Sequence, residues 1–197
     1  MDRTDLMRQI RDEVIALKAS PLYQYRIENR YKPVIGQGNH DADIIFIGEG
    51  PGKNEAETGV PFCGASGRIL DELLASIELP RAEVYVANII KDRPPGNRDP
   101  RPEEIELYGP FLDRQIEIIE PRVIATLGRF SMTYILQRYN CPEQTGSIGQ
   151  LHGKIIKTVI GERSTTILPL YHPAVAVYNR NMLNDLKKDF VVLKSLI

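Results

Sequence analysis

The sequence contains few of the residues on which several protein classes depend. Its 197 residues include no tryptophan and only two cysteines, Cys63 and Cys141. Two thiols are too few for a disulfide framework or a four-thiolate metal site. No apolar run approaches the ~20 residues that cross a membrane, and the charged N-terminus does not resemble a secretory signal. We therefore expect a protein of the reducing cytoplasm, in the interior of a prokaryotic cell, with no membrane partner.

An excess of charge of one sign is also missing. The formal net charge is −1 at pH 7, and 26% of the residues are charged and 42% hydrophobic, which is ordinary for a globular protein. A nucleic acid would therefore have to be bound by a local basic patch, because the protein as a whole does not attract a polyanion.

Strands and helices alternate along the chain. We interpret residues 20–40 as irregular structure covering the core, and the segment 103–119 as a helix that Gly109 and Pro110 could break. The predicted fold is an α/β, three-layer α/β/α sandwich with a central, mainly parallel sheet of four to five strands, in one domain over residues 1–197. Such sheets bind ligands beyond the carboxyl ends of their strands. The expected strands are 43–48, 84–90, 123–127, 154–160 and 165–170, and the other expected helices include 66–77, 131–138 and 182–196.

The loop after the first strand carries two carboxylates, Glu49 and Glu55, in a glycine-rich turn. The spacing of its glycines does not match that of a phosphate-binding loop. Backbone amides such as that of Gly50 could approach a planar ligand, and a carboxylate beside it could orient water. A solvated turn with surface glutamates is the simpler interpretation of this loop alone. Phe62, which follows, could belong to the core or form a stacking face for a base.

The loop after the second strand begins with Asn88, whose amide could pair with the edge of uracil and distinguish it from cytosine. A basic cluster follows, which could contact DNA or be merely a solvated face; it comprises Lys91, Arg93, Arg98 and Arg101.

His172 follows the last strand, where its imidazole could stabilise charge on a departing base, although a lone histidine can also be structural. The apolar segment 175–177 and the polar residues after it, Asn179 and Arg180 among them, suit a wedge that fills the space left by an extruded base.

Three blocks resemble, in order, the signatures of the family 4 uracil-DNA glycosylases. They are the segment from Gly48 through Glu55 to Phe62 and Gly67, the segment Asn88–Arg98, and the run His172-Pro173-Ala174. The resemblance implies that Phe62 stacks on uracil, Asn88 reads its edge and His172 stabilises the leaving base. Glu49 and Glu55 match the two carboxylates of the family motif, and the resemblance does not settle which of them handles the water.

The resemblance also implies a four-cysteine iron–sulfur cluster, and here the sequence departs from it. The ligand positions fall near Pro21 and Gln24 and on Asp92 and Tyr108, none of which is cysteine. We therefore expect no cluster, no metal and no other cofactor. In its place we expect a packing of tyrosines, namely Tyr23, Tyr25, Tyr31 and Tyr108.

Together these features predict a monofunctional glycosylase that hydrolyses the N-glycosidic bond of deoxyuridine in single- or double-stranded DNA, releases free uracil and acts as a monomer. Two alternatives remain open at this point. One is a glycosylase for another deaminated base, hypoxanthine or xanthine; the other is a non-catalytic protein that binds damaged DNA.

Overall fold

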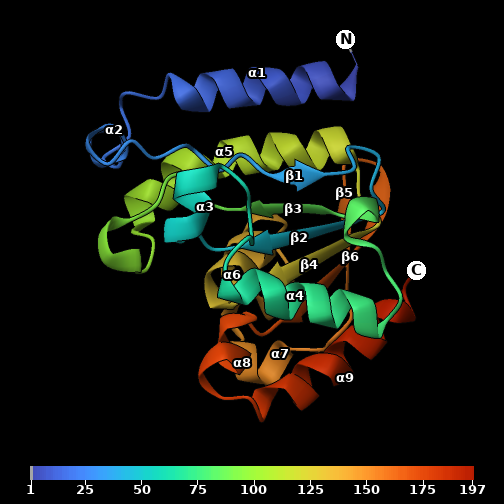
Figure 1. Cartoon of the computed structure of the whole chain (residues 1–197). Coiled ribbons are helices and arrows are strands. Elements are labelled where there is room, and N and C mark those ends of the chain that lie inside the picture. The colour runs from blue at the N-terminus through green and yellow to red at the C-terminus, as the bar shows by residue number, and fades with distance from the viewer. Residues whose placement is uncertain (1) are drawn as a thin grey trace.

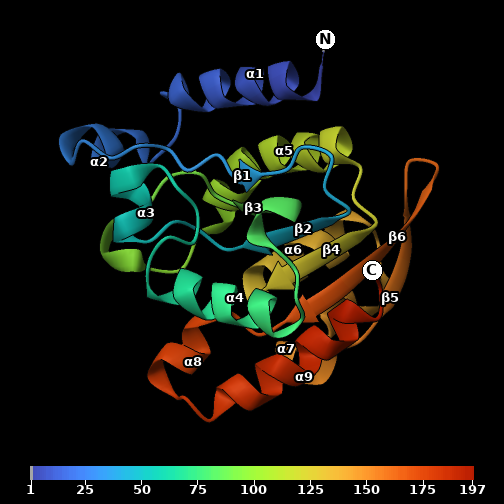
Figure 2. The same cartoon turned by 45° about the vertical axis from the view of Figure 1, so that its right-hand side comes forward.

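A six-stranded sheet with helices on both faces forms the centre of the protein in the computed structural model, which describes residues 2–197 (Figures 1 and 2). The strands are β1 (Gln37–Gly38), β2 (Ile44–Gly48), β3 (Tyr85–Asn88), β4 (Val123–Leu127), β5 (Ile156–Ile160) and β6 (Arg163–Leu170). The helices are α1 (Arg3–Ile15), α2 (Tyr23–Glu28), α3 (Lys53–Thr58), α4 (Ala65–Ser76), α5 (Pro102–Ile119), α6 (Arg129–Arg138), α7 (Ile148–Leu151), α8 (Ala174–Tyr178) and α9 (Met182–Lys194).

The strand order is β1-β3-β2-β4-β6-β5, with β3, β2, β4 and β6 parallel and the two edge strands antiparallel. This confirms the predicted three-layer α/β fold with a mainly parallel sheet. The predicted number of strands was too low by one, because β1 is only two residues long and carries no hydrophobic pattern. The segment before it contains α2, so the interpretation of residues 20–40 as wholly irregular was wrong.

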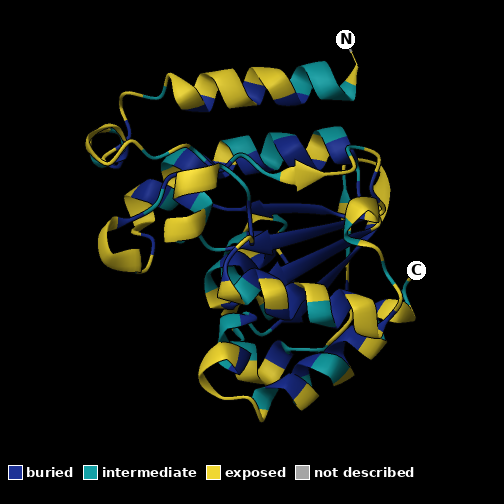
Figure 3. Cartoon of the chain, viewed as in Figure 1, coloured by how far each residue is buried: buried dark blue, intermediate teal, exposed yellow. Residues whose placement is uncertain are grey.

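Alternation along the central strands divides the core into two halves. In β2, Ile45 and Ile47 pack with α1, α5 and α6, whereas Ile44 and Phe46 pack with α4 and α9. Every residue of β2, β3 and β4 is buried, as the dark strands of Figure 3 show. A sheet covered on both faces can offer a ligand only its edges and the ends of its strands.

Helix α5 continues through Gly109 and Pro110 without a break. Proline removes one helical hydrogen bond, but α5 is held on both sides of it by the buried residues Tyr108, Leu112 and Ile116. Gly109 leaves room for the Tyr134 hydroxyl, which a Cβ would meet at 2.4 Å. No helix among residues 2–197 has the length and apolar character needed to span a bilayer.

A buried ion pair, rather than a packing of tyrosines, lies where the resemblance implies an iron–sulfur cluster. Arg26 from α2 donates to both carboxylate oxygens of Asp92 at 3.1 Å, and the two side chains are 4% and 0% exposed. Tyr108 donates to the same carboxylate at 2.6 Å and lies 2.7 Å from the Ser20 hydroxyl. Two of the four positions at which the resemblance implies ligands, Asp92 and Tyr108, are thus bonded to each other.

The expectation about the tyrosines is therefore only partly correct. Tyr108 belongs to the network, and the Arg26 guanidinium lies 4.9 Å from the centre of the Tyr23 ring. Tyr25 and Tyr31 contact each other edge to face, with ring centroids 5.9 Å apart. No group of three or more histidine, cysteine or acidic side chains in residues 2–197 could hold a metal.

The substitution Arg26→Met should lower the free energy of unfolding by about 3–5 kcal/mol, because it leaves the Asp92 carboxylate buried without its cation. Denaturation in urea measures this loss. The double variant Arg26→Met, Asp92→Leu should recover most of it. Arg8→Met, which removes an exposed ion pair on α1, is the matched control and should change stability little. An Arg26→Met protein as stable as the control would show that the pair does not hold α2 to the fold.

Candidate active site

A cavity of about 440 Å³ opens at the carboxyl ends of the parallel strands, beside α3 and α8. The chain runs from β2 to its neighbour β3 on one side, whereas the later strand β4 pairs with the other side of β2. Open α/β sheets bind ligands where the strand order reverses in this way. The cavity brings together seven of the residues predicted for the site from the sequence: Glu49, Gly50, Glu55, Phe62, Asn88, Arg98 and His172.

Gly48, the last residue of β2, makes this convergence possible. A Cβ at Gly48 would lie 2.4 Å from Asn88 Oδ1 and 2.8 Å from the Phe62 ring, closer than real Cβ contacts. Gly128, after β4, leaves similar room, since a Cβ there would lie 2.5 Å from Glu49 Oε1 and 3.3 Å from His172 Cβ. The glycines therefore set the distances between the functional side chains.

Asn88, which lines the cavity, carries an unused hydrogen-bonding atom. It is the last residue of β3 and only 2% exposed, yet its Oδ1 has no hydrogen-bond partner within residues 2–197. A buried polar atom without a partner is costly and rare in folded proteins. A ligand that donates a hydrogen bond at this point would satisfy it.

Phe62 forms one wall of the cavity and lies in a strained backbone conformation. Its φ is +50°, a region that residues other than glycine seldom adopt. The conformation directs its carbonyl against Gly67 of α4, where a Cβ would lie only 1.7 Å from it. The Phe62 ring faces His172 with centroids 5.7 Å apart and an interplanar angle of 31°.

His172 is neutral, and the structure indicates its tautomer. Burial lowers its pKa to about 4, against an opposing effect of the Glu55 charge. Its Nδ1 accepts a hydrogen bond from the Ala174 amide at 3.1 Å. Because a neutral imidazole carries one proton, Nε2 must be the donor. His172 therefore offers an N–H group and no positive charge.

The two glutamates differ in how firmly they are held. Glu55 Oε1 accepts from the Gly64 amide at 2.8 Å, which ties it to the start of α4. The contact of Glu49 with the Phe130 amide is longer, at 3.5 Å. Burial raises the pKa of Glu49; the Phe130 amide lowers it, and the nearby Asp99 and Arg129 charges act in opposite directions.

The residues predicted to contact DNA are not all available to do so. Lys91 is fully buried and cannot reach a phosphate, so this prediction was wrong. Arg98 lines the cavity while paired with Glu104 of α5. Arg93 lies beyond it, bonded to Tyr31 and Asn97 at 2.7 Å each.

On the other side of the cavity, Asn179 and Arg180 are exposed after α8, but neither lines it. Tyr178, the last residue of α8, does line it and is 90% exposed. Tyr178 is the first of the polar residues that follow the apolar segment 175–177, for which the sequence suggests a wedge. Its only signal was an aromatic residue close after the histidine.

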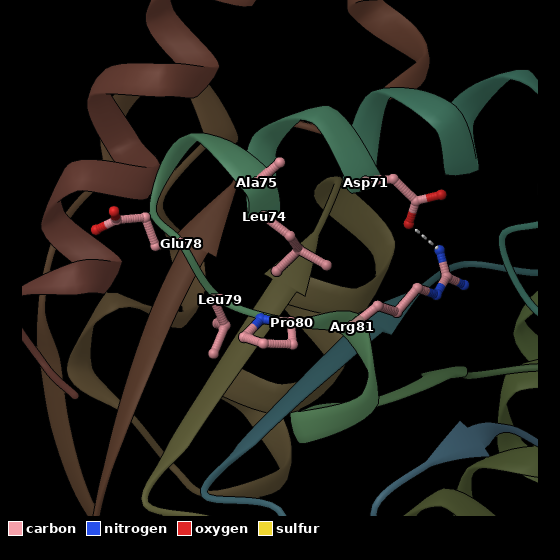
Figure 4. Close-up of a pocket in the computed structure, with 7 residues that line it drawn as sticks. All are labelled: Asp71, Leu74, Ala75, Glu78, Leu79, Pro80 and Arg81. Atoms are coloured by element: carbon pink, nitrogen blue, oxygen red, sulfur yellow. Dashed lines mark hydrogen bonds and ion pairs between the residues drawn. The ribbon is translucent and has the colours of Figure 1, made fainter.

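A larger hollow, of about 510 Å³, lies elsewhere, at the end of α4 (Figure 4). It is lined mainly by apolar atoms, and its charged groups are Glu78 and the Asp71–Arg81 pair, whose members bond to each other at 2.7 Å. It contains none of the predicted site residues. The smaller cavity, with its unpaired amide oxygen and neutral histidine, is the candidate active site.

Comparison with known proteins identifies the family. The sequence profile of the uracil DNA glycosylase superfamily matches residues 35–193. The chain is 41% identical to a type-4 uracil-DNA glycosylase of Sulfurisphaera tokodaii, over 98% of this chain and 85% of the relative. It is 40% identical to one of Saccharolobus solfataricus, over 100% and 88%, and 38% identical to one of Thermotoga maritima, over 98% and 93%.

The profile covers most of the chain, and the relatives match nearly all of it. The chain belongs to the uracil DNA glycosylase superfamily and, within it, to the type-4 enzymes.

Proposed function

We propose that the protein removes uracil from DNA by hydrolysing the bond between uracil N1 and deoxyribose C1′. The observation that carries this proposal is the pairing, in one cavity, of the unsatisfied Asn88 amide oxygen with a neutral, Nε2-protonated His172. The first recognises the ring N–H of uracil, and the second donates to a uracil carbonyl oxygen as charge builds on it.

The base must leave the helix to enter the cavity, which costs a few kcal/mol. Phe62 then stacks on the extruded uracil, and the amide of Gly50 approaches it from the first loop. When the N–C1′ bond breaks, the electron pair goes to uracil, and the N–H group of His172 stabilises the resulting anion. A neutral histidine suits this role, because it donates the hydrogen bond without transferring its proton early.

Glu49 is the carboxylate that supports the attack of water. Glu55 is held by the Gly64 amide, whereas Glu49 has only its long contact with Phe130. Water adds to C1′ and its proton passes to Glu49, which releases it through solvent to the uracil anion; an abasic site, free uracil and an ionised Glu49 remain. All of these groups come from one chain, so a monomer would hold the complete site, and among residues 2–197 no lysine lines the cavity to form a covalent adduct with the sugar.

Groups around the cavity that keep contact with solvent would hold the DNA. Arg98 and Arg93 lie on the loop after β3, and Asn179 and Arg180 follow α8 on the other side. Tyr178 stands between the second pair and the cavity, where its ring could occupy the space left by the extruded base.

The first prediction concerns the reaction itself. A labelled duplex with one central uracil should be cleaved after treatment with the protein and then with alkali. His172→Ala should lower the rate about 10²- to 10³-fold through loss of the hydrogen bond to the departing base, and Asn88→Ala should also reduce it strongly. His40→Ala, a histidine that contacts Thr4 outside the cavity, is the control and should leave the rate unchanged.

If the wild-type protein leaves uracil intact in single and double strands, the proposal fails. Duplexes that carry hypoxanthine or xanthine would then test a different base specificity. Binding without cleavage of any of them would indicate a protein that only recognises damage.

The second prediction concerns pH. Because burial raises the pKa of Glu49 above 4.5, kcat should fall on the acidic side as this carboxylate is protonated. His172, with a pKa of about 4, should contribute nothing above pH 5. Glu49→Gln should lower kcat roughly 10²- to 10⁴-fold and flatten the acidic limb. Glu55→Gln keeps an acceptor for the Gly64 amide and should retain the acidic limb of the pH profile. If this variant instead loses the limb, Glu55 rather than Glu49 supports the attack of water.

The third prediction concerns Tyr178. If its ring compensates for the lost base stacking, Tyr178→Ala should slow the excision of uracil from a duplex more than from a single strand. The ratio of the two rates measures this effect and is independent of enzyme concentration. Val191→Ala, which removes an exposed apolar side chain on α9, should leave the ratio unchanged. An unchanged ratio in Tyr178→Ala would rule out the wedge.

A further inference from the structure

Lys91 is the most deeply buried cation of the loop that follows β3. Its side chain is 0% exposed, and its Nζ donates to the main-chain oxygen of Asn88 at 2.8 Å and to Gln115 Oε1 at 2.6 Å. Both acceptors are uncharged. Burial accordingly lowers the pKa of Lys91 to about 7.

Such a lysine is unfavourable for folding. An ammonium group taken out of water is poorly compensated by neutral acceptors, and an apolar side chain of similar length would fill the same space without that penalty. Packing alone therefore does not explain a lysine at this position.

One of the two hydrogen bonds of Lys91 goes to Asn88, the residue proposed to recognise uracil. Asn88 is the last residue of β3, and its side-chain oxygen has no hydrogen-bond partner among the described residues. The protein therefore cannot orient Asn88 through that atom, and contacts with its main chain have to contribute. The ammonium of Lys91, three residues further on, supplies one such contact at the Asn88 carbonyl.

Lys91 is in turn held from two directions. Gln115 of α5 accepts from it and donates to Tyr85 at 3.1 Å and to the Ile35 carbonyl at 3.0 Å. The main-chain oxygen of Lys91 accepts from the Val34 amide at 2.7 Å. The position of the ammonium is thus fixed by α5 and by the segment before β1.

We propose that Lys91 is a positioning residue for Asn88: by holding the main-chain carbonyl of Asn88, its ammonium fixes the amide that selects uracil. This inference rests on the proposed function. It assigns to Lys91 a part in base recognition in place of the DNA contact that its burial excludes.

The test compares Lys91→Met, which keeps the length of the side chain but loses both hydrogen bonds, with Leu112→Ala. Leu112 is a buried residue of α5 outside this network, so its truncation destabilises the fold without touching Asn88. Three quantities are measured for each protein: the Kd for free uracil, kcat/KM on uracil DNA, and the ratio of that value to kcat/KM on hypoxanthine DNA.

Lys91→Met should weaken the binding of free uracil and lower kcat/KM on uracil DNA by roughly 10- to 100-fold, since a small misplacement of a binding group has effects of this size. Its preference for uracil over hypoxanthine should fall. Leu112→Ala should keep the wild-type Kd and preference. Lys91→Arg, which restores a donor, should recover part of the loss.

If Lys91→Met matches Leu112→Ala in all three quantities while the wild-type protein excises uracil, the inference is wrong and the proposed function stands. If the wild-type protein does not excise uracil, the proposed function fails and the inference fails with it. Should Lys91→Met not fold, Lys91→Gln keeps a polar side chain that is one atom too short to hold the Asn88 carbonyl. It should also weaken the binding of free uracil, and a wild-type Kd in this variant would overturn the proposal.

Discussion

The site depends on one steric constraint, the absence of a side chain at Gly48. At the end of β2 the backbone passes so close to Asn88 and Phe62 that a single added carbon would displace both. A planar base can be stacked and read at its edge only if the stacking face and the reading amide lie beside each other. The parallel sheet brings β2 and β3 to the same edge, and the glycine allows their side chains to meet there.

The loop that leaves β3 is fixed by two buried charges of opposite sign in consecutive positions. Lys91 bonds back to Asn88 and to α5, whereas Asp92 bonds outward to Arg26 of α2 and to Tyr108 of α5. The bonds of Lys91 hold the end of β3 in place beside the cavity. The bonds of Asp92 secure the start of the loop that carries Arg93 and Arg98. In the arrangement that the resemblance implies, the segments joined by Asp92 would be held by iron and sulfur; here an ion pair and two hydroxyl groups join them.

Much of this arrangement followed from the sequence, for identifiable reasons. The buried strands appear as apolar runs, and Glu49, Asn88 and His172 stand at strand ends or within two residues of them, so the topology places them at one edge of the sheet. β1 and α2 were missed because neither a two-residue strand nor a six-residue helix in a polar segment has a clear hydrophobic period. The burial of Arg26 and Lys91 was also beyond prediction. Each depends on a partner far along the chain, Asp92 for the first and Gln115 for the second, and an isolated charged residue in a loop is normally solvated.

Lys91 shows that a cluster of basic residues in a sequence need not form one basic surface in the structure. In the sequence it stands with Arg93, Arg98 and Arg101, and the cluster suggests one surface for phosphates. In the structure these side chains lie in different surroundings and contact different groups. Arg101 is exposed, Arg98 is held at the rim by Glu104, and Lys91 is enclosed beneath the strand end. Only groups that retain contact with solvent can exchange it for phosphate, so the cluster supplies fewer DNA contacts than its charge suggests. Lys91, the first residue of the cluster, acts inside the protein, where it fixes the position of the Asn88 amide that the base must meet.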